Sequence, residues 1–246
     1  MAPKQPDNPH DRALEGTTQF EHSVRHLFDP ADPSPQKRSS SPIPLFVALH
    51  GQGMSATSFR RVCRHLPTTG HGSLFPEGPY RFEMRDGTTI REGHGWYIYL
   101  GDSDQFRDEL NRSEAHLLTV LDQVERNHGP FDQRRSILLG FSQGGYLAGY
   151  VALRHPDRFG GVVISSARLK HEFLTEELRT GALPAVLILH SPEDSSTAYD
   201  RAVEGRDLLE AAGADVELHS HSGGHRLPAE ALEKVAEWAR ERDLLR

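Results

Sequence analysis

Cysteine, long apolar runs and excess basic charge are all lacking in this sequence of 246 residues, and each lack excludes a class of protein. The single cysteine, Cys63, has no partner for an internal disulfide, which suits a reducing compartment. No segment approaches the roughly 18 apolar residues that cross a bilayer, and residues 1–16 lack the apolar core of a signal peptide. We therefore expect a cytoplasmic protein without a membrane span.

Basic residues are outnumbered by acidic ones, 28 against 35, so the formal net charge of -7 argues against a nucleic-acid partner. The 15 histidines are scattered and show no metal-ligand spacing, so we expect no metal and no other cofactor. This composition favours small or neutral partners. The chain is expected to be a monomer or a homodimer.

Short apolar segments alternate with amphipathic ones along most of the chain. Strand character is present at 19–28, 43–51, 73–82, 136–141, 161–165, 184–190 and 215–219, and helical spacing at 55–66, 105–127, 143–154, 197–212 and 228–243. This alternation is typical of an α/β fold with a mostly parallel sheet and helices on both faces. We expect residues 1–16 to be a flexible polar extension and residues 17–246 to form a single domain.

Two connections differ from the rest. Residues 29–42 are rich in proline and serine, and are expected to join the first two strands as an exposed hairpin connection. Residues 84–102 contain a second hairpin signal, Asp86-Gly87, and then an aromatic cluster at 96–99. We interpret residues 84–102 as an excursion over the sheet, whose aromatic side chains either border a binding site or form a small core of their own.

Ser142 lies in the segment GFSQG at 140–144, between an apolar run and a stretch with helical spacing. A sharp strand-to-helix turn strains the residue at its apex, and the residues two positions away must be small so that β-carbons do not collide. Gly140 and Gly144 complete the G-x-S-x-G pattern of a nucleophile elbow. We predict that Ser142 is a nucleophile, the alternative being a small-residue junction that serves packing only.

A serine nucleophile needs a base, and the base needs an acid to orient it; on this fold both follow the serine in the chain. The segment VELHSHSGGHRLP offers His219, His221 and His225. We favour His225, because the two glycines before it allow the imidazole to reach back over the sheet. Acid candidates follow the strand at 184–190, and the residue pattern leaves a choice among Glu193, Asp194 and Asp200.

An oxyanion formed at the serine needs two hydrogen-bond donors. The backbone N–H of Gln143, directly after the nucleophile, is one candidate. The second is expected from a loop after an early strand, and the glycine-rich segment LHGQGM supplies the N–H of Gln52. A plain tight turn is the alternative interpretation of that segment.

Together these segments resemble the phospholipase/carboxylesterase family of α/β-hydrolases, which includes acyl-protein thioesterases and bacterial carboxylesterases. The matching motifs, in order, are LHGQG at 49–53, GFSQGG at 140–145, HSPED at 190–194 and GGHRLP at 223–228. The resemblance covers roughly residues 43–243 and implies an α/β-hydrolase fold. It also implies the following roles: nucleophile Ser142, acid Asp194, base His225, and oxyanion donors Gln52 and Gln143.

Two departures from the family pattern concern the substrate more than the mechanism. Ser191 stands where members usually have glycine, so we expect the acid-bearing loop to differ in shape. Trp96 aligns with a Trp-Phe-Asp segment of the family, but the aspartate is absent here. Trp96 and Met54 are our candidate substrate contacts.

The resemblance implies a serine carboxylesterase that hydrolyses short- to medium-chain acyl or aryl esters through an acyl-enzyme, with a small-molecule ester substrate as its partner and no cofactor. The same residues serve acyl thioesterases, lysophospholipases and serine peptidases, because the motif does not specify the leaving group. A scaffold of this type that binds a small ligand without turning it over is a further alternative.

Overall fold

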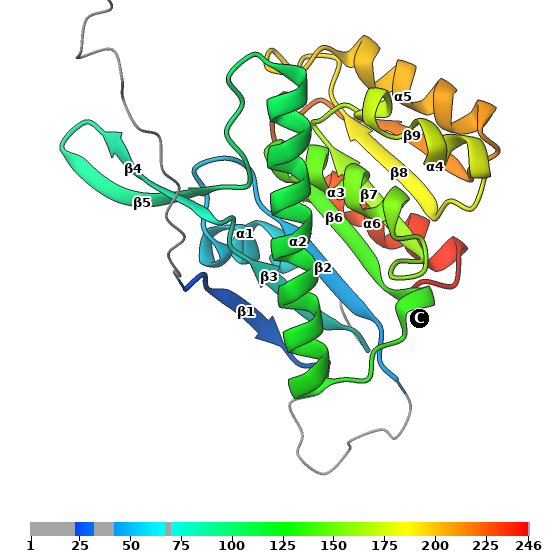
Figure 1. Cartoon of the computed structure of the whole chain (residues 1–246), viewed down its shortest axis with the longest axis horizontal. Coiled ribbons are helices and arrows are strands. Elements are labelled where there is room, and N and C mark those ends of the chain that lie inside the picture. Colours follow the sequence, from blue (N-terminus) through cyan, green and yellow to red (C-terminus); the bar gives the residue numbers. More distant parts are fainter. Residues whose placement is uncertain (1–22, 32–41, 67–69, 246) are drawn as a thin grey trace, which may run out of the picture.

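A seven-stranded sheet organises the protein (Figure 1). The computed structural model describes residues 23–31, 42–66 and 70–245, so the extension expected at 1–16 lies outside the described residues. The strand order is β1-β3-β2-β6-β7-β8-β9, and every neighbouring pair is parallel except β1 with β3. The strands are β1 (His26–Asp29), β2 (Leu45–Leu49), β3 (Gly72–Pro76), β6 (Ile137–Phe141), β7 (Gly161–Ser165), β8 (Ala185–His190) and β9 (Val216–Ser220).

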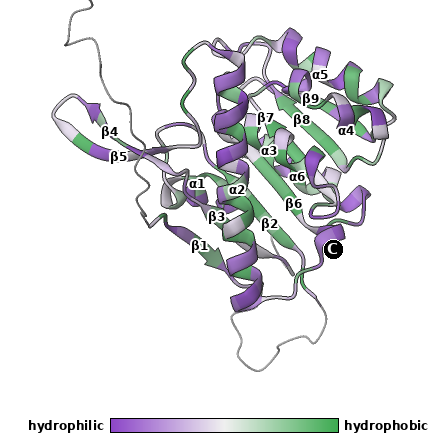
Figure 2. Cartoon of the chain, viewed as in Figure 1, coloured by the Kyte–Doolittle hydropathy of each residue, from purple (hydrophilic) through white to green (hydrophobic). Residues whose placement is uncertain are grey.

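The inner strands are apolar because helices cover both faces of the sheet. Every residue of β2 and β7 is buried, and the hydrophobic strands stand out against the polar outer sides of the helices (Figure 2). Parallel strands buried on both faces have this near-continuous apolar composition. The prediction of a mostly parallel α/β fold is confirmed.

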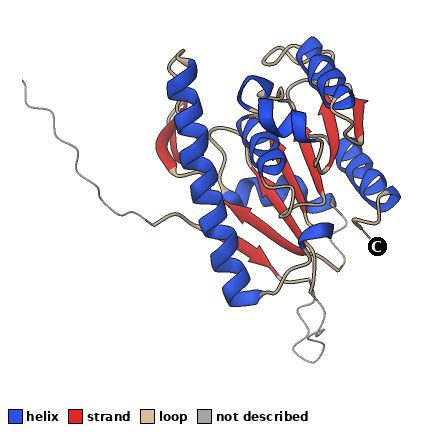
Figure 3. Ribbon diagram, turned by 45° about the vertical axis from the view of Figure 1, so that its right-hand side comes forward, coloured by secondary structure: helices blue, strands red, loops and turns tan. Residues whose placement is uncertain are grey.

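Two helical layers form a core on each side of the sheet. One core includes residues of α2, α3 and α5, such as Leu117, Tyr150 and Leu209, and the other includes residues of α1 and α6, such as Phe59 and Trp238. The helices are α1 (Ala56–Val62), α2 (Ser103–His128), α3 (Gln143–Arg154), α4 (Thr175–Thr180), α5 (Tyr199–Ala211) and α6 (Ala229–Glu241). The long helix α2 packs beside α3 on one face of the sheet (Figure 3). Among the described residues, no helix is both long and apolar enough to span a bilayer.

Two helices, α1 and α2, begin at a capping side chain. Ser55 accepts a hydrogen bond from the N–H of Ser58, whose hydroxyl accepts one from the N–H of Ser55 in return, so the two serines form a capping box at α1. Asp102 accepts from the N–H of Gln105 and caps α2. Both helices therefore start at a residue whose side chain satisfies a free backbone N–H.

The first connection differs from our expectation. We expected residues 29–42 to link a hairpin of the first two strands, but β1 pairs antiparallel with β3. Strand β2 has β3 on one side and β6 on the other, so neither of its edges is free to accept β1. Residues 32–41 of this connection lie outside the described residues.

The second hairpin is confirmed. Strands β4 (Tyr80–Asp86) and β5 (Thr89–Gly95) pair antiparallel as a separate two-stranded sheet that projects from the main body (Figure 1). Gly87 has a φ of 58°, a left-handed conformation that suits a two-residue hairpin turn. The short helix α4 was not expected from the sequence.

The glycines around Ser142 are needed for close packing. A Cβ built on Gly144 would overlap the backbone oxygen of Leu49, and one built on Gly140 would overlap that of Gly144. We predict that Gly144→Ala lowers the free energy of unfolding by about 1 to 3 kcal/mol, as expected of an overpacked site, in urea denaturation.

Gly205→Ala is the matched control. Gly205 lies inside α5, where the nearest atom to an added Cβ is a side-chain carbon of Leu169 at 3.3 Å, and alanine favours a helix by about 1 kcal/mol. We expect its stability to stay within about 1 kcal/mol of wild type. Equal stabilities of Gly144→Ala and wild type would contradict the packing argument.

Candidate active site

Ser142 occupies a strained position between β6 and α3. Its φ is 52° and its ψ -119°, a conformation that side-chain-bearing residues rarely adopt and that is expected at a nucleophile elbow. The N–H of Ser142 donates to the carbonyl of Ser165 at 2.9 Å, which fixes the turn to the end of the neighbouring strand β7. The structure therefore places Ser142 at the carboxyl edge of the sheet.

His225 and Asp194 lie in line with this serine. The Nε2 atom of His225 is 2.9 Å from Ser142 Oγ, and its Nδ1 atom is 2.8 and 3.0 Å from the two oxygens of Asp194. An ionised carboxylate only accepts hydrogen bonds, so Nδ1–H donates to Asp194, and Nε2 is left to accept from the serine hydroxyl. These three residues come from loops after β6, β8 and β9.

The Asp194 carboxylate is held in its ionised form. Burial by itself would raise its pKa, but hydrogen bonds from the N–H groups of Thr197 and Ser196 and from His225 outweigh this effect, so the pKa lies below its ordinary value. The side chain is fully buried. Asp194 can therefore keep a negative charge beside the imidazole and stabilise its protonated form.

The other acid and base candidates lie elsewhere. Glu193 is exposed and Asp200 lies in the first turn of α5. His219 is part of β9, and His221 accepts a hydrogen bond from the N–H of Gly223. None of these four side chains contacts Ser142 or His225 among the polar contacts of the described residues.

Ser191 connects the acid loop with the histidine loop. Its Oγ accepts hydrogen bonds from the N–H of Glu193 at 3.2 Å and from the N–H of Gly224 at 3.1 Å. A glycine at 191 would lack this hydroxyl. Serine in place of the family's glycine at 191 was noted in the sequence, but the contact that this serine makes between the two loops was not predicted.

Gln52 sits in a turn that is held from several sides. The N–H of Met54 donates to the carbonyl of Gly51, and Gly53 has a φ of 77°, which are the features of a type II turn. The N–H of Gly53 donates to the carbonyl of His94 in β5 at 2.8 Å, and the N–H of His94 donates to the carbonyl of Met54 at 3.1 Å. The projecting hairpin therefore fixes the loop that carries the Gln52 N–H.

His50 is a neutral imidazole, and two hydrogen bonds of its ring hold the start of the same loop. Its Nδ1–H donates to the carbonyl of Gly51 at 2.8 Å, and its Nε2 accepts from the N–H of Gly78 at 3.0 Å. Full burial lowers its pKa to about 4, although the hydrogen bond to Gly51 acts in the opposite direction. Sequence reasoning missed this residue, because an isolated histidine after a strand carries no distinctive pattern.

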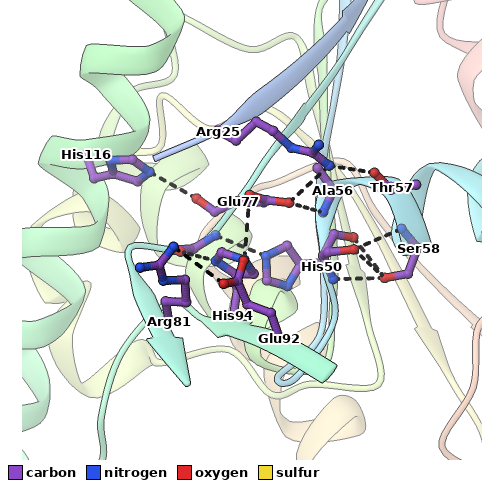
Figure 4. A network of polar contacts seen from close by, with 12 residues as sticks. Arg25, His50, Ala56, Thr57, Ser58, Glu77, Arg81, Glu92, His94 and His116 are labelled. Atoms are coloured by element: carbon purple, nitrogen blue, oxygen red, sulfur yellow. Dashed lines mark hydrogen bonds and ion pairs between the residues drawn. The ribbon is translucent and has the colours of Figure 1, made fainter. Parts of the chain in front are cut away.

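A buried carboxylate continues the network behind the loop (Figure 4). Glu77 Oε1 accepts from the N–H of Ala56 at 3.2 Å and lies 3.5 Å from Arg25, while its Oε2 is 3.6 Å from His94 Nε2. The His94 ring also contacts Glu92 at 3.2 Å. Glu77 thereby ties the start of α1, directly after the turn, to the hairpin.

The Gln143 side chain makes contacts that sequence reasoning did not find. Its side-chain oxygen accepts from the N–H of Trp96 and its side-chain nitrogen donates to the carbonyl of Tyr97, both at 2.8 Å. Gln143 is the first residue of α3, so its backbone N–H is one of the first-turn donors that have no acceptor within the helix. The residue thus joins the nucleophile elbow to the segment after β5.

A cleft of about 1860 Å³ opens over Ser142. Gln52, Gln143 and His225 line it together with Tyr97, Ile98, Tyr99, Phe106 and Tyr146. Trp96 and Met54 are not among its lining residues: Trp96 is fully buried and donates from its indole to the carbonyl of His50, and Met54 is half-buried. Trp96 therefore supports the wall of the cleft from behind.

In the part of the chain that the structure describes, no three metal-ligating side chains gather.

The family model described as Phospholipase/Carboxylesterase matches residues 34–241. The chain belongs to this family. The family indicates a hydrolase. A search among curated proteins finds no match.

Solved structures of similar proteins agree with the fold of the family. The Bacillus cereus carboxylesterase is 21% identical, with a TM-score of 0.66 over 89% of this chain and 94% of its own. Esterase PE8 is 21% identical, with a TM-score of 0.69, and the match covers 89% of this chain and 99% of the PE8 chain. Zea mays acyl-protein thioesterase 2 is 19% identical, with a TM-score of 0.66, and the match covers 89% of this chain and 99% of the thioesterase chain.

The neutral His50 makes stability depend on pH. An unfolded chain binds a proton at this imidazole near pH 6.5, whereas the folded protein takes it up only near pH 4, so stability falls as the pH drops through this window. We predict that His50→Gln, although less stable than wild type at pH 7, loses about 2 kcal/mol less than wild type between pH 6.5 and pH 5 in urea denaturation. Parallel losses in the two proteins would contradict this assignment.

Proposed function

We propose that this protein is a serine carboxylesterase that hydrolyses carboxylic esters through an acyl-enzyme on Ser142. The observation that carries the proposal is the continuous hydrogen-bonded chain from Ser142 Oγ through the His225 imidazole to the Asp194 carboxylate, with contacts of 2.9 and 2.8 Å. A serine hydroxyl is a weak nucleophile until a base removes its proton, and this arrangement supplies the base and its orienting acid.

In the first half-reaction Ser142 Oγ attacks the ester carbonyl while its proton moves to His225 Nε2. The imidazolium that forms is stabilised by the Asp194 carboxylate on its other nitrogen. The negative oxygen of the tetrahedral intermediate is bound by the N–H groups of Gln52 and Gln143, and the N-terminus of α3 adds its positive end. The intermediate collapses when His225 returns the proton to the leaving alcohol.

The second half-reaction uses the same groups on water. His225 accepts a proton from a water molecule, whose oxygen attacks the acyl carbonyl, and then donates the proton to Ser142 Oγ as the acid product leaves. The aromatic side chains of the cleft, Tyr97, Tyr99, Phe106 and Tyr146, provide apolar surface for an acyl or aryl group.

Removal of the nucleophile tests the proposal directly. We predict that Ser142→Ala lowers kcat for 4-nitrophenyl esters from acetate to laurate by a factor on the order of 10⁵ or more, because it removes the atom that forms the acyl-enzyme. A fluorophosphonate probe is expected to label wild type and to spare the variant. The matched control is Ser220→Ala, an exposed serine whose hydroxyl contacts only Tyr199 among the described polar contacts.

Ester hydrolysis by Ser142→Ala at the wild-type rate, with both proteins folded, would overturn the mechanism. A peptide and a thioester substrate belong in the same panel. Preference for either over the esters would assign the same serine to another leaving group.

Substitution of Asp194 tests whether this carboxylate orients His225. We predict that Asp194→Asn lowers kcat by about 10⁴-fold, since an amide that donates to Nδ1 favours the wrong imidazole tautomer. Glu193→Gln removes the neighbouring, exposed carboxylate and is expected to leave kcat within a factor of about two. Equal losses in the two variants would mean that the acid of the site is not Asp194.

A further inference from the structure

The wall of the cleft is more basic than the rest of the protein. The chain contains 35 acidic and 28 basic residues, yet the cleft over Ser142 is lined, among the residues that the structure describes, by five basic side chains and two acidic ones. These are Arg25, Arg81, Arg112, Arg168, Lys170, Glu77 and Glu92. Low-dielectric walls focus the field of such charges into the cleft, which favours an anionic ligand.

Only two of the five basic residues share a carboxylate. Three have a carboxylate each, in the pairs Arg25–Glu77, Arg81–Glu92 and Arg112–Glu109. Arg168 and Lys170 both contact Glu172, at 2.8 and 3.3 Å from its Oε1 atom. Glu172 is not among the residues that line the cleft. One carboxylate, Glu172, is therefore in direct contact with both cations. Glu204 also acts on Arg168, but it forms its own ion pair with Arg201.

Arg168 and Lys170 reach the cleft from the strand next to the nucleophile. They follow β7, which ends at Ser165, the residue whose carbonyl accepts from the N–H of Ser142. The ammonium of Lys170 lies 5.8 Å from the ring centre of Tyr146, which is one helical turn after Ser142 in α3. Both cations thus lie at the same edge of the sheet as the elbow.

The surroundings of Lys170 leave its charge incompletely compensated. The residue is only 7% exposed, and its ammonium lies 4.2 Å from the ring centre of Phe106 and 5.7 Å from that of Phe173. Burial lowers its pKa, and so does the nearby Arg168, while Glu172 acts in the opposite direction. An ammonium has three donors, and its hydrogen bond to Glu172 uses one. An acceptor in the cleft would stabilise this partly buried cation.

We infer that the ester substrate carries a carboxylate, and that Arg168 and Lys170 bind this group while Ser142 attacks the ester carbonyl. This inference rests on the proposed esterase function. A carboxylate is the anion that fits, because its single negative charge, added to that of Glu172, balances the two cations. Tyr97 and Tyr146 line the same cleft, and would contact the apolar part of such a substrate.

The test compares esters that differ only in this charge. The 4-nitrophenyl monoesters of adipic and suberic acid are measured against 4-nitrophenyl hexanoate and octanoate, in which a methyl group replaces the carboxylate. A third pair, 3-carboxy-4-nitrophenyl butyrate and 4-nitrophenyl butyrate, places the carboxylate on the leaving group. We expect the anionic ester of at least one pair to have a kcat/KM about 10- to 100-fold above that of its neutral partner, the range of a charge-assisted hydrogen bond.

Two substitutions move this ratio in opposite directions. Lys170→Met removes the uncompensated charge with little change of shape, and is expected to bring the ratio of anionic to neutral kcat/KM close to one. Glu172→Gln removes the competing carboxylate, and is expected to raise the ratio above that of wild type. Arg107→Met is the control: Arg107 lies over the Phe173 ring at 4.9 Å but does not line the cleft, so the ratio should stay unchanged. Urea denaturation checks that each variant is folded.

The outcomes separate the inference from the function on which it rests. Hydrolysis of neutral esters that requires Ser142, with ratios near one in every pair, overturns the inference and leaves the esterase standing. A preference for anionic esters that survives Lys170→Met, or that falls in Glu172→Gln, also overturns it. If wild type hydrolyses none of the esters and its Ser142 is unreactive to a fluorophosphonate, the proposed function fails and the inference fails with it.

Discussion

The close approach of β6 and α3 at Ser142 is the constraint on which the rest of the site depends. The turn between them leaves no space for a Cβ at Gly140 or Gly144, and it holds Ser142 at a positive φ of 52°. Such strain persists only where packing over-determines it, and here the N–H of Ser142 is also bound to the carbonyl of Ser165. The serine is thereby fixed in front of the imidazole before any substrate binds.

Backbone groups and buried polar side chains position the loops around this elbow. The N–H groups of Ser196 and Thr197 keep Asp194 ionised, and Ser191 joins the acid loop to the histidine loop. On the opposite side, His50 and the hairpin hold the turn of Gln52. Since loops are otherwise the most mobile parts of a fold, these contacts hold the loops in the fixed arrangement that the proposed oxyanion stabilisation requires.

The charges of the protein are divided between its surface and its cleft. Most of the acidic excess lies away from the cleft, whose wall carries basic side chains and aromatic rings side by side. The aromatic rings favour apolar groups, and the cations favour a negative group. A net charge for the whole chain cannot show this division, because it sums over residues that lie on different faces of the molecule.

The sequence by itself determined those features that depend on neighbouring residues. The apolar run of β6, the glycines around Ser142 and the helix at 143–154 are local, so their pattern predicted their structure. The contact of His225 with Ser142 could also be anticipated, because the loop order of the fold and the two glycines before His225 restrict where the proposed base can come from.

Only the tertiary structure decided the features that depend on residues far apart in the chain. β1 pairs with β3 because β2 has no free edge, which no local pattern reveals. Trp96 is buried behind the cleft because Gln143, which is 47 positions away, binds its backbone N–H. Lys170 faces the cleft because β7 lies beside β6 in the sheet. In each case the deciding contact joins two segments that are far apart in the sequence. The residue pattern of either segment alone therefore cannot predict the contact.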